Sequence, residues 1–144
     1  MKITLLSLPL KRTWDIVLTR YRARQVARLL GFAPNEQAFI AAAAAEIAAE
    51  GFENTSRAGV VFEVEHLALA IRAERTGRLR LTRKLPLRPE FAVEDAAWIL
   101  EQLEREPFRP YDEFRRQNQE LLRLLAESSS MRASPSAPDE SHAA

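Results

Sequence analysis

The sequence predicts an α+β fold: an antiparallel sheet of three to four strands with helices packed on one face, followed by a C-terminal helix. Three observations support this prediction. Apolar residues recur at helical spacing up to residue 51, they alternate with polar residues between 60 and 82, and proline pairs then delimit two further helical segments. The 144 residues fit one domain, since 47% are hydrophobic and 28% are charged, an ordinary globular balance.

The N-terminal segment predicts a short strand and a helix. Residues 3–8 fit an edge strand that ends at Pro9. Thr13 is typical of a helix N-cap, and apolar spacing extends this helix to about Leu30. Gly31 is a natural stop, because glycine readily adopts the left-handed conformation that ends many helices.

A second helix is predicted from Pro34, which suits a first helical position, to Gly51. It contains five consecutive alanines, Ala41 to Ala45. Side chains this small allow another element to approach closely. We therefore expect a tightly packed core helix.

The middle of the chain predicts a three-stranded antiparallel meander with one face buried and the other in water. Apolar residues alternate over 60–64 and again over 67–71, but the parity shifts by one residue between these segments. Such a shift indicates a tight turn or bulge near Glu65–His66. A second turn is predicted at Thr76–Gly77, where a third alternating segment begins.

Basic residues of this third segment predict a positive ridge on the wet face of the sheet. Arg78, Arg80 and Lys84 belong to it. The ridge fits either a solvated face or a site for an acidic partner protein. Binding of nucleic acid is not expected, because aromatic residues are not interleaved with the basic ones and the net charge is only +1.

The last part of the chain predicts a third helix over about 93–103 and a final helix from Tyr111, with prolines between them. Five residues of the final helix are spaced as a heptad seam: Tyr111, Phe114, Asn118, Leu121 and Leu125. This seam fits either a homodimeric coiled coil or packing of the helix onto its own domain. From Ser128 onward the composition predicts a disordered tail. The expected parts are therefore an α+β domain over 1–105, a C-terminal helix over 106–127 and a tail over 128–144.

Several classes of function lack the residues they need. There is no cysteine, and the two histidines, His66 and His142, stand in a predicted turn and in the tail. Neither a catalytic triad nor a metal site is therefore expected. The four glycines are too scattered to form a phosphate-binding loop. No apolar run approaches the roughly 20 residues of a membrane span, so we expect no membrane association and a cytoplasmic location.

Glu46 and Glu50 are the sharpest candidate pair. They lie four residues apart on the second predicted helix and so share a face. If both are exposed, they repel each other mildly. If they are buried together, one pKa is raised, and the pair could act in acid–base chemistry or bind a divalent ion.

Residues 15–32 and 36–48 resemble the first two helices of the RsbT-type switch kinases, which are anti-sigma regulators of the histidine-kinase-like (GHKL) ATPase superfamily. In that family the second helix carries a glutamate that assists catalysis and an asparagine that holds the magnesium ion of ATP. The resemblance places Glu46 at the glutamate position. It places Glu50 at the asparagine position, where a second carboxylate puts magnesium–ATP binding in doubt.

The strands over 60–64, 67–73 and 77–85 also resemble this family, but its glycine boxes and ATP lid are missing. Only Thr76–Gly77 stands between the last two strands. Residues 97–103 and 111–122 resemble the linker that joins such domains to a coiled coil in larger bacterial signalling proteins. The resemblance thus covers roughly residues 14–126, without the ATP-specific third.

The resemblance implies a non-catalytic signalling module that binds a regulatory protein, such as an antagonist or a sigma-factor regulator, and no cofactor. The alternative is a minimal protein kinase that retains ATP and magnesium. In that case Glu46 would act as the base, and Arg78, Arg80 and Lys84 would grip the triphosphate in place of loop amides.

Overall fold

The computed structural model describes residues 2–54, 57–76, 78–87 and 95–142. The chain divides into two units, Met1–Pro110 and Tyr111–Ala144. The elements of the first unit are β1 (Lys2–Leu10), α1 (Trp14–Leu29), α2 (Pro34–Asn54), β2 (Ala58–Glu65), β3 (Ala68–Arg75), β4 (Arg78–Pro86) and α3 (Asp95–Arg105). The last helix is α4 (Pro110–His142), which lies in the second unit from Tyr111 onward.

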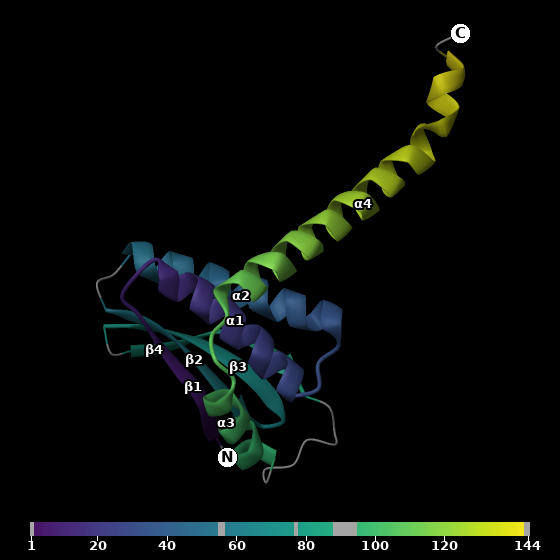
Figure 1. Cartoon of the computed structure of the whole chain (residues 1–144). Helices are drawn as coiled ribbons and strands as arrows, with labels where there is room; N and C mark the ends of the chain where they lie inside the picture. Colours follow the sequence, from purple (N-terminus) through teal and green to yellow (C-terminus); the bar gives the residue numbers. More distant parts are fainter. Residues whose placement is uncertain (1, 55–56, 77, 88–94, 143–144) are drawn as a thin grey trace. The chain divides into compact units, whose positions relative to one another are not determined.

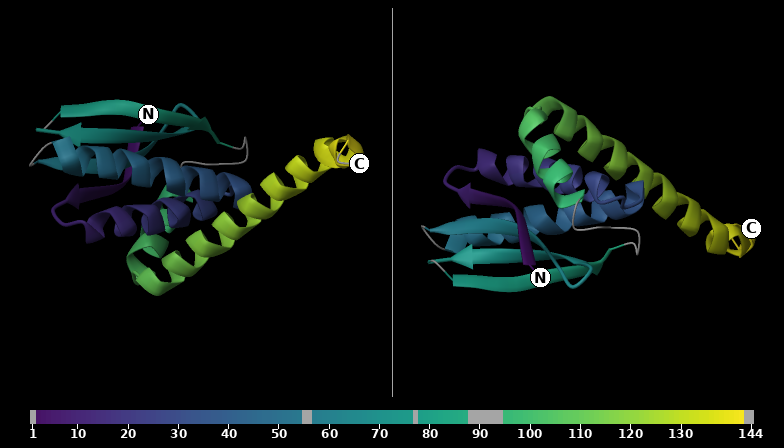
Figure 2. Two further views of the ribbon diagram at one scale, coloured as in Figure 1. Left: turned by 90° about the horizontal axis from the view of Figure 1, so that it is seen from above. Right: turned by 90° about the horizontal axis from the view of Figure 1, so that it is seen from below.

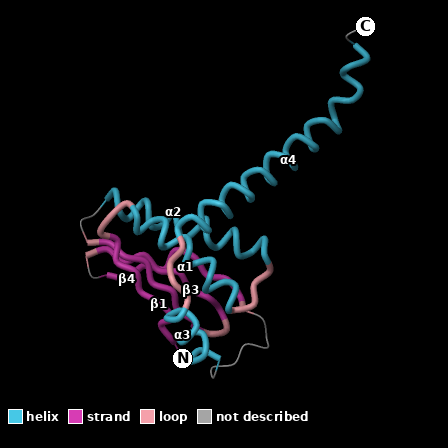
Figure 3. Tube along the Cα trace, viewed as in Figure 1, coloured by secondary structure: helices cyan, strands magenta, loops and turns pink. Residues whose placement is uncertain are grey.

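The predicted α+β fold is confirmed. The four strands form one antiparallel sheet in the order β1-β2-β3-β4. Helices α1 and α2 lie together on one face of this sheet (Figures 1 and 2). Helix α3 packs against α1 and β1. Figure 3 distinguishes the helices, in cyan, from the strands of the sheet, in magenta.

The core lies between these two helices and the sheet. The alanine-rich surface of α2 is buried, as predicted, and α1 meets it with small side chains such as Ala23 and Ala27. Large apolar side chains of the sheet fill the space beneath. The fully buried residues of this core include Val26, Ile40, Ala44, Ala48, Val60, Phe62, Leu69 and Ile71.

The start of α1 differs from the prediction. Thr13 has helical backbone angles and makes no side-chain capping bond. Instead, the carboxylate of Asp15 accepts hydrogen bonds from the backbone N–H of Lys11 at 2.7 Å and of Arg12 at 2.9 Å. The acidic residue of the first turn therefore satisfies the donors that precede the helix. At the other end, Gly31 has a φ of +86°, as its predicted role requires.

Two further boundaries differ from the sequence expectation. Pro9 does not end β1, because it remains in register opposite Gly59 and the strand continues to Leu10. The missing N–H of proline is tolerated there because β1 is an edge strand. The second helix also continues past Gly51 to Asn54.

The turn between β2 and β3 is confirmed and consists of His66 and Leu67, which both have positive φ, 48° and 59°. A type I′ hairpin turn requires this geometry at both central residues. Thr76 of the second predicted turn also has a positive φ, 51°, while Gly77 lies outside the described residues.

A bulge in β4 overturns the predicted positive ridge. The register pairs Arg72 with Leu81 but Ile71 with Arg83, so Thr82 is an extra residue. Its hydroxyl donates a hydrogen bond to the carbonyl of Ile71 at 2.8 Å. In a regular strand, residues an even number of positions apart lie on the same face of the sheet. Because of the extra residue, two such residues on either side of Thr82 lie on opposite faces.

The basic residues of β4 consequently lie on two faces. Arg78 and Arg80 stand opposite Arg75 and Ala73, on the face that α2 covers. Lys84 stands opposite Ala70 on the other face, 3.9 Å from the carboxylate of Glu65. The alternation in the sequence could not reveal this, because a single inserted residue reverses its parity.

In the C-terminal region, α3 begins at Asp95, and the predicted start near residue 93 lies outside the described residues. The seam residues of α4 are exposed within the chain: Tyr111, Phe114, Asn118, Leu121 and Leu125. The structure continues α4 to His142. The structure does not describe side chains from residue 130 onward. The disordered tail over 128–144 therefore stays a prediction.

Candidate functional site

Glu46 and Glu50 both lie on the exposed surface of α2. This agrees with the solvent-exposed alternative for the pair and gives no buried carboxylate dyad. Their surroundings differ, however. Glu50 contacts a residue of strand β3 and lines a concavity whose lining does not include Glu46.

The Glu50 carboxylate forms an ion pair with Arg75 of β3, whose Nη2 lies 3.2 Å from Oε1. Arg75 reaches α2 because it lies on the helix-covered face, opposite Ala58 of β2. Both side chains are partly in water, so the pair itself adds little stability. The ion pair matters for ligand binding instead. The family resemblance places Glu50 at the position of a metal ligand, and here the Glu50 carboxylate is already paired with the Arg75 guanidinium.

A concavity of about 650 Å³ lies between α2 and the strands β3 and β4. Its lining includes Ile47, Glu50, Arg75, Thr76, Arg78 and Arg80. Glu46 is not among the lining residues. Three arginines against one glutamate give the lining a formal charge of 3 − 1 = +2.

The cationic groups of this concavity are incompletely matched. The Nε of Arg75 is buried and makes no hydrogen bond to any described atom. Arg83, further along β4, lies over the ring of Phe39, with Cζ 5.4 Å from the ring centroid. The arrangement therefore attracts anions such as carboxylate or phosphate and repels a divalent cation.

Acid–base and metal chemistry find little support in these surroundings. Among the described residues, no three His, Asp or Glu side chains are grouped so that they could hold a metal ion. His66 lies in the turn before β3, whereas the lining residues Arg75 and Thr76 lie at the other end of that strand. Lys84 lies on the opposite face of the sheet, so the predicted trio of Arg78, Arg80 and Lys84 is not brought together.

The sheet face away from α2 carries a charged network that sequence reasoning missed. Arg72 donates from Nε to Glu63 at 2.5 Å and from Nη2 to Glu65 at 2.7 Å. Glu63 is also 3.9 Å from Lys2, and its side chain is only 4% exposed. These residues come from three strands, and register alone places them together.

Burial tends to raise the pKa of the Glu65 carboxyl, but the hydrogen bond from Arg72 and the charges of Lys84 and Lys2 outweigh it. The pKa of Glu65 is therefore held below its ordinary value. The same contacts, led by the hydrogen bond to Glu63, raise the pKa of Arg72. These contacts therefore favour the charged forms of Glu65 and Arg72, which suits a structural role.

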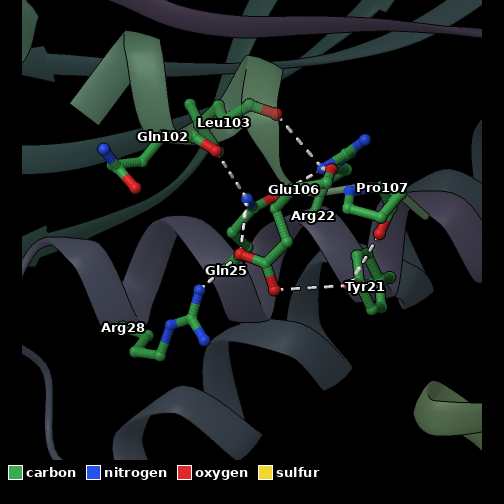
Figure 4. A network of polar contacts seen from close by, with 8 residues as sticks. All are labelled: Tyr21, Arg22, Gln25, Arg28, Gln102, Leu103, Glu106 and Pro107. Carbon is green, nitrogen blue, oxygen red and sulfur yellow. Dashed lines mark hydrogen bonds and ion pairs between the residues drawn. The ribbon is translucent and has the colours of Figure 1, made fainter. Parts of the chain in front are cut away.

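A second polar cluster fastens the C-terminal end of α3 to α1 (Figure 4). Arg22 donates to the carbonyls of Leu103 and Glu106, at 3.3 and 2.8 Å, which are among the unpaired acceptors at a helix end. The Glu106 carboxylate accepts hydrogen bonds from Gln25 and Arg28. Every group here has a partner within the fold, so we assign the cluster to structure.

Tyr21 completes this cluster as a neutral donor. Its hydroxyl donates to the carbonyl of Pro107 at 2.9 Å. Burial, followed by the nearby Glu106 carboxylate, raises the pKa of Tyr21 above its ordinary value. The ring also packs edge-on against Phe108, with the centroids 5.3 Å apart.

Comparison with protein-family models, with curated proteins and with solved structures found no match to this chain. Within the described part of the chain, no helix combines the length and apolar character that crossing a membrane requires.

Proposed function

We propose that the chain is a non-catalytic signalling module that resembles an RsbT-type anti-sigma ATPase domain without its ATP lid and acts through contacts with a regulatory protein. The observation that carries this proposal is the ion pair between Glu50 and Arg75. At the position where the resemblance expects a magnesium ligand, the carboxylate is matched to a guanidinium. A cation bound there would meet the positive charge of Arg75.

The missing glycine loops support the same conclusion. A triphosphate is normally held by backbone N–H groups that only a glycine-rich loop can bring close enough. No two glycines of this chain are near each other in sequence. We also propose a cytoplasmic location, because a sequence without cysteine carries no disulfide framework of the kind that oxidising compartments favour.

Titration calorimetry with magnesium–ATP tests the proposal. We expect no heat of binding at millimolar nucleotide, because both the lid and the metal ligand are lacking. The variant Glu50→Asn, which restores the amide of the family pattern, is the matched control and should also fail to bind, since the lid is still absent. Micromolar binding by the unmodified chain would overturn the proposal.

The alternative function, a minimal ATP-dependent kinase, is favoured by one observation. Arg78 and Arg80 line a concavity large enough for an organic anion, beside Glu50. Glu46, the proposed base, lies outside that lining, and Lys84 is on the other sheet face. If magnesium–ATP binds and Arg78→Ala/Arg80→Ala abolishes the binding, this alternative replaces the first proposal.

We further propose that the chain forms a homodimer through the α4 seam of Tyr111, Phe114, Asn118, Leu121 and Leu125. Leu121 and Leu125 are each 55% exposed within one chain, and a second copy would bury them. Light scattering should give a mass near twice 16.4 kDa for the unmodified protein.

The double variant Leu121→Ala/Leu125→Ala should give a monomer, because it removes the apolar part of the seam. Leu122→Ala/Leu124→Ala is the matched control: it removes two leucines beside the seam that are 66% and 57% exposed, and it should leave the dimer intact. A monomeric unmodified protein contradicts the dimer and leaves the signalling proposal unaffected.

A further inference from the structure

The two edges of the sheet are protected very differently. The β1 edge has Pro9, which lacks an N–H, a register shift between Thr4 and Leu6, and helix α3 packed against it. All three features discourage another strand from pairing there. The β4 edge runs for nine residues, and its only proline is the last, Pro86. Among the described residues, β3 is its one strand neighbour.

Strand β4 is also exposed along almost its whole length, from Arg78 to Lys84. In an antiparallel ladder, alternate residues of such an edge direct their N–H and C=O groups away from the sheet. These groups form a ready template for one more strand.

The side chains of β4 determine which residue types an added neighbouring strand should have. On the α2-covered face, Arg78 and Arg80 border the concavity and form no ion pair with any described residue. On the opposite face, Leu79 and Leu81 are 46% and 42% exposed. A complementary strand therefore alternates acidic residues, opposite the arginines, with apolar residues, opposite the leucines.

A second copy of this chain does not fit the same edge. Strand β4 contains Arg78, Arg80, Arg83 and Lys84 and no acidic residue. Antiparallel pairing of two such strands would place basic side chains against basic side chains, which is destabilising. The charge of the edge thus opposes self-association and favours an acidic partner.

We infer that β4 binds an extended acidic segment of the partner protein, which adds to the sheet as a fifth strand. This inference rests on the proposed function as a protein-binding module and names the chemistry of its partner. Main-chain hydrogen bonds supply the pairing, while Arg78, Arg80, Leu79 and Leu81 select alternating acidic and apolar side chains.

The probe is a fluorescein-labelled nonapeptide of alternating glutamate and valine, titrated into the full-length chain at low salt and followed by fluorescence anisotropy. We expect saturable binding. The variant Arg78→Ala/Arg80→Ala should weaken it at least about fivefold, as loss of two partly exposed charge pairs implies. Arg115→Ala/Arg116→Ala, on the exposed surface of α4, changes the net charge equally and should bind as the unmodified protein does.

Strand addition is separated from simple charge attraction by two readouts. Amide hydrogen exchange over residues 78–86 should slow at least about tenfold when the peptide is bound, because the outward N–H groups become hydrogen-bonded. A peptide of the same sequence with N-methylated central residues keeps the charge but loses the donors, and it should not bind. Equal binding of this peptide, or unchanged exchange in β4, overturns the inference.

Failure of the inference is distinguishable from failure of the proposed function. If neither the peptide nor magnesium–ATP binds, the fifth-strand inference is wrong and the non-catalytic proposal stands. If magnesium–ATP binds in the concavity, the proposed function is wrong, whatever the peptide does.

Discussion

Replacing Arg72 with methionine should lower the free energy of unfolding by about 3 kcal/mol, because it deprives a buried carboxylate of its closest cationic partner. Methionine keeps most of the aliphatic stem of arginine and removes only the guanidinium. That group donates to Glu63 at 2.5 Å and to Glu65 at 2.7 Å. Glu63 cannot turn to water, because its side chain is 4% exposed. Denaturant unfolding monitored by circular dichroism measures the loss.

Two control variants identify the cause of that loss. Adding Glu63→Gln to Arg72→Met removes the stranded charge and should recover part of the stability. Lys84→Met removes a cation from the same sheet face, but Lys84 is 43% exposed and 3.9 Å from Glu65, so its effect should stay below about 1 kcal/mol. If Arg72→Met is no worse than Lys84→Met, the network does not stabilise the fold.

The contacts of Glu65 with Arg72 should also make the free energy of unfolding decrease as the pH falls into the acid range. The pKa of Glu65 is lower in the folded protein than its ordinary value. A carboxyl of this kind stabilises the fold at pH values above the unfolded pKa, and the contribution is lost as the pH falls through the folded pKa. The unmodified protein should therefore lose more stability on acidification than Arg72→Met does, since the variant lacks the contact that lowers this pKa.

Features that depend on neighbouring residues were predictable from the sequence. Gly31 ends a helix because of its own backbone freedom, and Pro34 begins the next one because its φ is already helical. The parity shift around His66 located a hairpin turn, because strand alternation has a fixed period of two residues. These signals need no knowledge of tertiary contacts.

Features that depend on register were not predictable. The bulge at Thr82 sends Arg80 and Lys84 to opposite faces, and nothing local in the sequence marks it. The surroundings of the candidate site also depend on tertiary packing. The sequence identified Glu46 and Glu50 by their spacing, but only the packing of α2 on β3 pairs Glu50 with Arg75, 25 residues away, and leaves Glu46 outside the concavity.

The largest loss of stability is expected from Phe62→Ala, at about 3–5 kcal/mol. Phe62 is fully buried in β2 between Leu6 and Ile71 and belongs to the core under α1 and α2, so truncation leaves a cavity. For a domain of this size the melting temperature should fall by roughly 12–20 °C, measured by calorimetry.

The matched control for Phe62→Ala is Leu79→Ala, on the β4 edge. Leu79 is 46% exposed and faces away from the helices, so its truncation should cost no more than about 0.5 kcal/mol. A small effect there, beside a large one at Phe62, means that the exposed edge contributes little to the fold. The β4 side chains are then free to serve an acidic partner, and their substitution reports on binding alone. A loss at Leu79 comparable to that at Phe62 would instead show that the β4 edge is part of the core, and would contradict its use as a binding edge.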